Sequence, residues 1–344
     1  MSGIYEADGG LGAKLVANMV QITDDRISSD ALSNAHRNHL MLANGQSLAA
    51  LRGQSIGQGD SCIVVAAGPS IKRRNPIAMI KDAGYKGAII TTESAIAYCL
   101  KSGVVPDLVV TLDPHATRIV RWFGDPSLNE EALAQDDYYR RQDMDEAFAN
   151  ELEFNQEILN LVNEHGKDMK IALATSASEA VVSRVLETGM EIYWWNPMLD
   201  DPNLKGSKTR EMFDLNSMPC VNAGGNVGAS CWMMADAVLE KKYIGLTGMD
   251  FSYYEDTPPR NTQYYHEIVD LVGEENLDSV FMRVQNPHLA SWFYTDPAYM
   301  WYRNALLEMV AGSDSRTTNC TEGGIVFGDG IEFVPLMDFL HRHI

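Results

Sequence analysis

A glycine, a proline and a serine directly follow an apolar run near the start of this chain. The run at residues 62–67 stops at Gly68, Pro69 and Ser70, and a helical pattern begins at Ile71. Such an opening leaves backbone N–H groups of the first helical turn free to bind a phosphate, and the Ser70 hydroxyl adds a further donor. The structural alternative is that Pro69 and Ser70 only start a helix. Neither Walker A nor GxGxxG spacing is present.

A second glycine-rich turn precedes another helical pattern that begins at Val227. Glycine lets the backbone approach a ligand closely, although close packing of a helix on a sheet needs it too. The residues of this turn that we expect to line a bound phosphate donor are Asn222, Gly224, Gly225 and Asn226.

Three acidic residues follow predicted strands. Asp113 and Asp250 each come just after an apolar run, so both face the same rim if the strands are parallel. There they would hold a divalent cation or hydrogen-bond a ribose, whereas a single strand-end aspartate more often caps a turn. Glu93 follows a third strand, and it is either a catalytic acid or a residue beside a helix start.

Two histidines, His115 and His266, lie closest to these segments in the sequence. Either could deprotonate an acceptor hydroxyl, and His266 is the preferred candidate for that general base. The alternative for both is a loop histidine without a catalytic role. The pairs at 194–195 and 253–254 could stack a base or a sugar, although aromatic core is the expected role for at least one member of each pair.

The elements that position these residues alternate between strand and helix. The predicted strands are residues 62–67, 88–91, 108–112, 171–174, 191–194 and 243–247. Helical patterns follow most of them, for example at 177–187 and 227–239. This order predicts right-handed crossovers and an α/β fold, with a Rossmann-like, mostly parallel sheet covered by helices on both faces.

Three segments are expected along the chain. Residues 1–58 form a helical N-terminal annex, with a helix at 28–51. Residues 59–255 form the nucleotide-binding core, which carries a helical insertion at about 118–168. Residues 256–344 form a C-terminal helical region and a closing strand that pack on the core.

Composition excludes several partners. The 27 Lys and Arg against 47 Asp and Glu give a formal net charge of −20, which disfavours nucleic acid and anionic membranes. Five widely spaced cysteines without a CxxC pair predict buried thiols in a reducing compartment. There is no secretory signal pattern and no run of ~18 apolar residues. These features predict a cytoplasmic protein without a membrane span.

Several segments together resemble a known family in content and in order. They are residues 64–70 (VVAAGPS), 103–114 (GVVPDLVVTLDP), 224–227 (GGNV), 246–253 (LTGMDFSY) and 319–324 (NCTEGG). This set resembles the 6-hydroxymethylpterin diphosphokinase-like family, which includes the motility accessory factor glycosyltransferases. The resemblance covers roughly residues 60–340.

The stretch at 248–251 (GMDF) also resembles bacterial sialyltransferases, whose Gly-Pro-Ser loop binds the CMP phosphate. That likeness implies a sialyltransferase-like fold, a CMP-sugar donor on the two glycine-rich turns, and Asp250 beside the ribose or base. This chain has Ala66 and Ala67 where sialyltransferases carry an asparagine before the loop, and Thr92-Glu93 near the next strand.

Three functions follow from these patterns. The first is a nucleotide-sugar-dependent glycosyltransferase that moves a sialic or nonulosonic-type sugar to a hydroxyl of a glycan or protein acceptor, with His266, Asp113 and Glu93 as catalytic candidates. The second is a diphosphokinase-like transfer from ATP to a pterin alcohol, in which Asp113 and Asp250 hold Mg²⁺. The third is a non-catalytic nucleotide-binding protein.

Overall fold

The computed structural model describes residues 28–135 and 150–343. The first 27 residues of the predicted N-terminal annex, and residues 136–149 of the predicted helical insertion, lie outside the described residues. Residues 28–38 are helical. A 3-10 helix, His39–Asn44, follows this helix, so the helix predicted at 28–51 is shorter than expected.

The described residues form one large sheet in which ten strands pair in parallel. Its strands are β1 (Gln46–Ser47), β2 (Ser61–Val65), β3 (Ala88–Thr92), β4 (Leu108–Val110), β5 (Lys170–Ala174), β6 (Glu191–Pro197), β7 (Cys220–Val221), β8 (Tyr243–Thr247), β12 (Arg316–Asn319) and β13 (Ile331–Phe333). The order is β1-β6-β5-β4-β3-β2-β8-β12-β13, and β7 pairs with β6. The predicted α/β fold with a mostly parallel sheet is confirmed.

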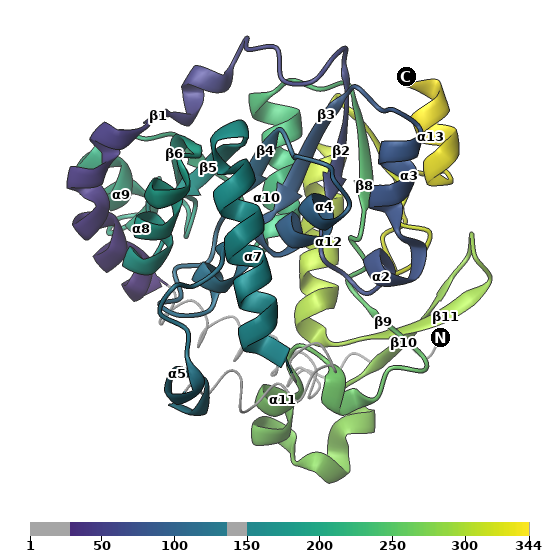
Figure 1. Cartoon of the computed structure of the whole chain (residues 1–344). Helices are drawn as coiled ribbons and strands as arrows, with labels where there is room; N and C mark the ends of the chain where they lie inside the picture. The colour runs from purple at the N-terminus through teal and green to yellow at the C-terminus, as the bar shows by residue number, and fades with distance from the viewer. Residues whose placement is uncertain (1–27, 136–149, 344) are drawn as a thin grey trace.

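Helices cover both faces of this sheet, whereas α5 and α11 lie away from it (Figure 1). The α-helices that Figure 1 labels are α2 (Ser70–Arg74), α3 (Pro76–Asp82), α4 (Ile96–Lys101), α5 (Glu130–Gln135), α7 (Glu151–His165), α8 (Glu179–Thr188), α9 (Lys208–Asn216), α10 (Val227–Met233), α11 (Tyr265–Val272), α12 (Pro297–Ala311) and α13 (Leu336–Arg342). A π-helical turn, Met234–Val238, continues α10. One helix predicted at 71–83 is split into α2 and α3, because Pro76 disfavours helical backbone at Asn75, whose φ is 50°.

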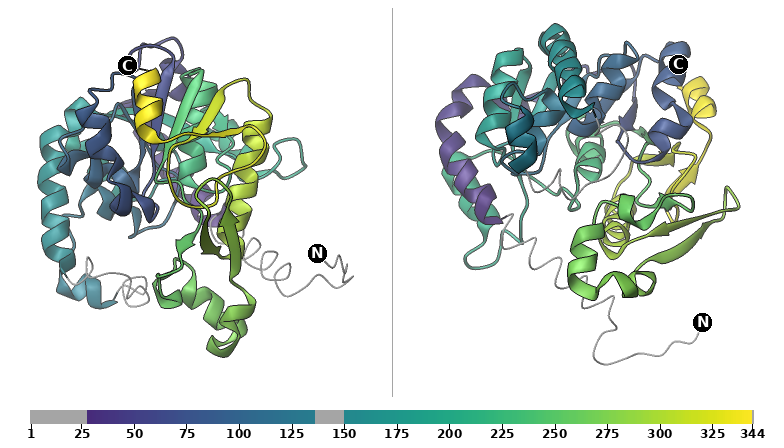
Figure 2. Two further views of the ribbon diagram at one scale, coloured as in Figure 1. Left: turned by 90° about the vertical axis from the view of Figure 1, so that its right-hand side faces the viewer. Right: turned by 60° about the horizontal axis from the view of Figure 1, so that its bottom comes forward.

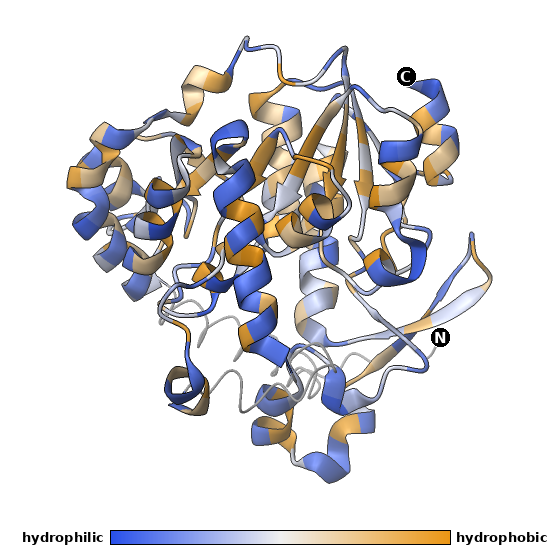
Figure 3. Ribbon diagram, in the orientation of Figure 1, coloured by the Kyte–Doolittle hydropathy of each residue, from blue (hydrophilic) through white to orange (hydrophobic). Residues whose placement is uncertain are grey.

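The core consists of strand side chains that alternate between two apolar layers. In β6, Tyr193 and Trp195 join the layer under α10 and α12, whereas Ile192 and Trp194 join the layer under α7 and α8. Because both faces are covered, the strands are apolar throughout, and the central strands in Figure 3 are coloured accordingly. Trp194 and Trp195 are both fully buried, so each is a core residue rather than a platform for a ligand.

The C-terminal third contributes strands that the sequence pattern did not predict. A small three-stranded sheet in the described chain contains β9 (Tyr253–Tyr254), β10 (Met282–Asn286) and β11 (Ser291–Thr295), and it forms a separate lobe with α11 (Figures 1 and 2). β12 reads as polar, yet it lies inside the large sheet between β8 and β13. Thr317 of β12 fills its buried position by accepting a hydrogen bond from Trp232 Nε1 at 2.8 Å.

Candidate functional site

The sheet reverses its strand order at β2. From β2 the chain builds β3 to β6 on one side, and it returns to the other side of β2 with β8 and then β12. In open parallel sheets, ligands bind at the carboxyl ends of the strands where the order reverses. The segments that follow β2 and β8 meet there, because Gly68 N donates a hydrogen bond to Gly248 O at 2.8 Å.

Asp250 and Ser70 form the centre of this crossing point. Asp250 Oδ2 accepts hydrogen bonds from Ser70 Oγ at 2.7 Å and from Ser70 N at 3.2 Å. Both side chains are buried, with 2% and 1% of their surface exposed. The sequence suggested the Ser70 hydroxyl and N–H as donors to a phosphate. Both instead donate to the carboxyl group of Asp250, which lies 180 residues later in the sequence.

Burial raises the pKa of Asp250 to about 7, although the Ser70 hydrogen bonds and the charge of Arg73 lower it. Its second oxygen, Oδ1, is buried and has no hydrogen-bond partner among the described residues. The carboxyl group fits here because two residues that contact it are glycines and lack a side chain. A Cβ at Gly68 would lie 2.3 Å from Asp250 Oδ2, and one at Gly323 would lie 3.2 Å from Oδ1.

The Asn222–Asn226 turn enters α10 at the same end of the sheet. Asn222 Oδ1 accepts a hydrogen bond from Gly224 N at 3.0 Å, and Asn226 Oδ1 caps the helix by accepting from Ala229 N at 2.9 Å. Both side chains thus shape the turn itself. Gly224 and Gly225 have φ values of 57° and 77°, a conformation that favours glycine.

Glu93 and Asp113 lie at the tips of β3 and β4. Glu93 is only 4% exposed, and its Oε2 has no hydrogen-bond partner in the described chain. Burial, with a smaller contribution from the charge of Asp113, raises the pKa of Glu93 to about 8. Asp113 is half-buried, and its Oδ1 accepts a hydrogen bond from His115 N at 2.8 Å.

The two candidate histidines are placed differently. His115 lies in the turn after Asp113, and its Nδ1 accepts hydrogen bonds from Thr117 N and Arg118 N, at 3.2 and 3.3 Å. His266 lies on α11 in the small lobe, where its ring packs edge-on against Tyr265 at 5.1 Å. Glu93 and Asp113 thus follow two neighbouring strands, whereas His266 lies on α11, whose N-cap residue Tyr264 hydrogen-bonds Tyr302 of α12 at 3.1 Å.

One aromatic residue at this end of the sheet, Trp301, was not predicted from the sequence. Trp301 lies on α12 with 40% of its surface exposed, and its ring packs on Gly225. The signal was weak because Trp301 lies within a helical pattern rich in apolar residues, which is typical of a core helix. Of the aromatic pair at 253–254, Tyr253 is buried and Tyr254 is partly exposed.

The residues suggested for a metal do not form a ready site. Among the described residues, no group of three or more His, Cys, Asp or Glu side chains is arranged to hold a metal ion. Asp250 already accepts two hydrogen bonds from Ser70, and the positive charge of Arg73 lowers its pKa.

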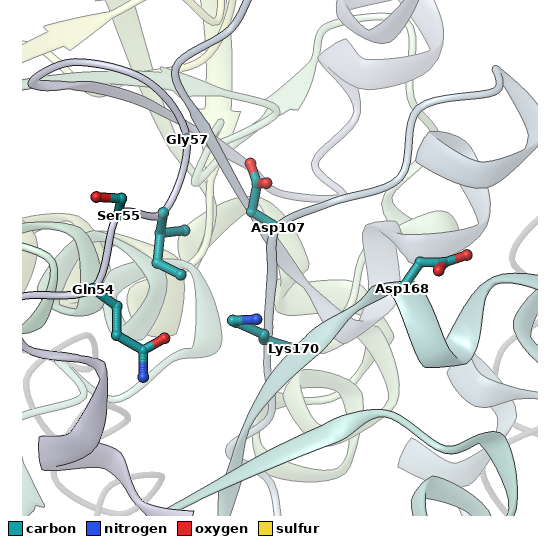
Figure 4. A pocket seen from close by; sticks show the side chains of 7 residues that line it. Gln54, Ser55, Gly57, Asp107, Asp168 and Lys170 are labelled. Carbon is teal, nitrogen blue, oxygen red and sulfur yellow. The ribbon is translucent and has the colours of Figure 1, made fainter.

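The described surface includes two depressions of similar size. One of 390 Å³ is at the amino ends of the strands, where Gln54, Asp107 and Lys170 line it (Figure 4). Two of its charged groups have structural partners, because Asp107 accepts a hydrogen bond from Ile89 N and Lys170 pairs with Glu191 at 2.7 Å. The other, of 440 Å³, is bordered by residues 198–203 and by Asn222, so it adjoins the turn before α10.

Residues 28–135 and 150–343 contain no helix that is both long and apolar enough to cross a membrane.

Comparisons with known proteins agree with the resemblance predicted from the sequence. The family model described as 6-hydroxymethylpterin diphosphokinase MptE-like matches residues 33–124, which include Gly68, Ser70, Glu93 and Asp113. A search of curated proteins finds no match.

The solved structures include one of a similar fold, the MAf glycosyltransferase from Magnetospirillum magneticum AMB-1. The TM-score is 0.54 with 14% sequence identity, over 90% of this chain and 38% of that chain. The chain therefore spans well under half the length of that protein, and the likeness concerns the fold.

Proposed function

We propose that this protein is a transferase that uses a nucleotide-activated donor, and that it moves a sugar to an acceptor hydroxyl. A CMP-sugar is the favoured donor, and a glycan or a protein hydroxyl is the favoured acceptor. The proposal is supported by the crossing point of β2 and β8, where Ser70, Asp250 and the glycine-rich turns meet at the carboxyl ends of the strands. The fold shared with a glycosyltransferase and the matched diphosphokinase-like family model both support a transferase.

In this mechanism the donor phosphate lies over the Gly68–Ser70 loop, and Asp250 is the residue that tunes its binding. A pKa of about 7 means that a large share of Asp250 is protonated at neutral pH, which limits repulsion of a phosphate. In its protonated form the unpartnered Oδ1 carries the proton and becomes a hydrogen-bond donor. Fixed donors of this kind stabilise charge that builds on a departing phosphate.

Glu93 and Asp113 have different roles in the proposed mechanism. With a pKa of about 8, Glu93 keeps its proton at neutral pH and acts as a hydrogen-bond donor or general acid. Asp113 is half-exposed and is the candidate to accept the proton of the acceptor hydroxyl. In this proposal Asp113 is the favoured base, and His266 on α11 is the alternative.

The second candidate is Mg²⁺-dependent diphosphate transfer from ATP to a pterin alcohol, because the matched family model carries that description. In that reaction Asp113 and Asp250 would have to hold the cation together with the ATP phosphates. The hydrogen bonds from Ser70 and the enclosure by Gly68 leave Asp250 poorly placed for a metal ligand. We therefore rank sugar transfer first.

Ligand-induced stabilisation separates these functions. We expect the unfolding temperature to rise with CMP or a CMP-sugar, equally with and without Mg²⁺, because a ligand that binds only the folded state stabilises it. The same screen includes UDP, GDP, ATP and 6-hydroxymethylpterin. Stabilisation by ATP only when Mg²⁺ is present would contradict sugar transfer. No response to any nucleotide would contradict both transferase proposals and favour a protein that has lost the chemistry.

A further inference from the structure

The second turn of α12 presents aromatic side chains to the glycine turn before α10. A Cβ added at Gly225 would lie 2.2 Å from the Trp301 ring, so this ring lies directly on the turn. One at Gly224 would lie 2.8 Å from Met309 Sδ, which places another α12 side chain under the same turn. Even so, 40% of Trp301 stays exposed. The turn therefore carries an apolar and partly open surface.

Tyr302 continues this surface beside Trp301. A Cβ added at Gly225 would lie 3.1 Å from Tyr302 Cε1, so both rings lie against the same turn. The two rings lie 5.3 Å apart between centroids, tilted by 57°. The Tyr302 hydroxyl is held by Tyr264 Oη at 3.1 Å, which fixes the ring.

Unused hydrogen-bonding capacity lies at the tip of β3, the strand on which α10 packs directly after the glycine turn. Glu93 follows this strand, and its Oε2 is buried without a partner in the described chain. A buried polar atom without a partner is costly unless something else binds it. An aromatic face next to a polar edge is the arrangement that binds a flat nitrogen heterocycle, which stacks on the face and hydrogen-bonds through its rim.

We propose that Trp301 and Tyr302 form the stacking wall for the planar heterocycle of the substrate, with Glu93 hydrogen-bonding the edge of that ring. The ring is either the base of the nucleotide donor or a pterin, since both offer a flat face and N–H groups on the rim. This inference rests on the proposed function, because it assigns the ring end of the ligand whose phosphate end lies near Ser70.

Calorimetric titration of the full chain with ring-bearing and ring-free ligands tests the wall. The ring-bearing probes are CMP, ATP and 6-hydroxymethylpterin, and ribose 5-phosphate is the probe without a ring. We expect Trp301→Ala to raise the Kd of the bound ring-bearing probe about tenfold, whereas Trp301→Phe changes it by less than about threefold. The Kd of ribose 5-phosphate should stay the same. Which ring-bearing probe responds identifies the ring as a base or a pterin.

Trp292→Ala is the matched control, because Trp292 is 43% exposed on β11 of the small lobe and packs on Arg283. It should leave every Kd unchanged. Equal affinities of wild type and Trp301→Ala for all ring-bearing probes would overturn the inference. So would an equal loss for ribose 5-phosphate, because that result means the glycine turn itself has moved. Binding of no ring-bearing probe by the wild type would overturn it together with the proposed function.

The two proposals can fail separately. A tenfold loss in Trp301→Ala, together with unchanged binding in Ser70→Ala, would support the wall and refute the phosphate position. The reverse pattern would support the phosphate position and refute the wall.

Discussion

At the scale of single residues, the contact between Ser70 and Asp250 decides how the proposed phosphate site behaves. The Ser70 hydroxyl donates to Asp250 Oδ2 at 2.7 Å and favours the charged carboxylate. Without that hydroxyl, the pKa of Asp250 rises further and the side chain loses its orientation.

We therefore predict that Ser70→Ala weakens nucleotide binding by roughly tenfold, the size of effect expected for a hydrogen bond to a charged group. Ser61→Ala is the control, since Ser61 lies at the amino end of β2 and hydrogen-bonds Tyr85 Oη at 2.8 Å. It should lower stability but leave the Kd unchanged. Titration of both variants measures the difference, and equal affinities would remove Ser70 from the site.

Glu93 predicts a pH dependence of stability. Its pKa is about 8 in the folded protein against an ordinary value of 4.5, so the folded state binds the proton more tightly than the unfolded state. The stability that the proton provides is present at low pH and is lost as the pH rises from about 4.5 to 8.

Glu93→Gln keeps a neutral side chain of similar shape at every pH. We predict that it becomes more stable than the wild type as the pH rises, by a few kcal/mol at about pH 9 and little at about pH 5. Denaturant unfolding at several pH values measures this difference. Glu153→Gln, at an exposed position of α7, should show no such trend. A difference that is constant with pH would refute the buried proton on Glu93.

At the scale of elements, the loop after β8 depends on glycine for space as well as for conformation. Gly248 has a φ of 65°, and a Cβ there would lie 2.0 Å from Ala66 O. Gly84, between α3 and β3, has the same φ of 65° but no atom within 4 Å of an added Cβ. Alanine substitutions at these two glycines therefore separate the energetic cost of the left-handed backbone from the cost of the steric clash with Ala66.

We predict that Gly84→Ala lowers the free energy of unfolding by about 1 kcal/mol, the usual penalty for a left-handed backbone. Gly248→Ala should lower it by more than about 3 kcal/mol or prevent folding, because the strand-end loops must separate. Chemical denaturation of both variants is the measurement. Equal losses would mean that the loops after β2 and β8 are not packed together as described.

At the scale of the whole molecule, the C-terminal segment completes both the sheet and the site. β12 pairs with β8 on one side and β13 on the other, and the loop after it brings Gly323 and Gly324 against Asp250. Removal of this segment would expose the edge of β8 and uncover a buried carboxyl group.

We predict that a chain ending at Ser313 aggregates or is digested rapidly by proteases, whereas a chain ending at Leu340 folds normally. Of the described residues, the second truncation removes the exposed His341 and Arg342 and the partly buried His343. Size-exclusion chromatography and limited proteolysis compare the two. A folded and protease-resistant chain ending at Ser313 would contradict the central place of β12 in the sheet.

The sequence alone determined the class of fold and the positions of the main strands. Six apolar runs separated by helical patterns lie where β2 to β6 and β8 form, because a parallel strand buried on both faces must be apolar along its length. The glycine turns and the acids after these strands were visible for the same reason, since they interrupt apolar runs. The polar strand β12 gave no such signal, because Thr317 is satisfied by Trp232 from α10.

Only the tertiary structure decided which of these residues meet. The reversal of strand order at β2 places Asp250 on Ser70, although 180 residues separate them. The same long-range packing puts Trp301 on Gly225 and leaves His266 in the small lobe. Local patterns cannot encode such contacts, because they depend on the order in which strands pair and not on the residues next to each other in the chain.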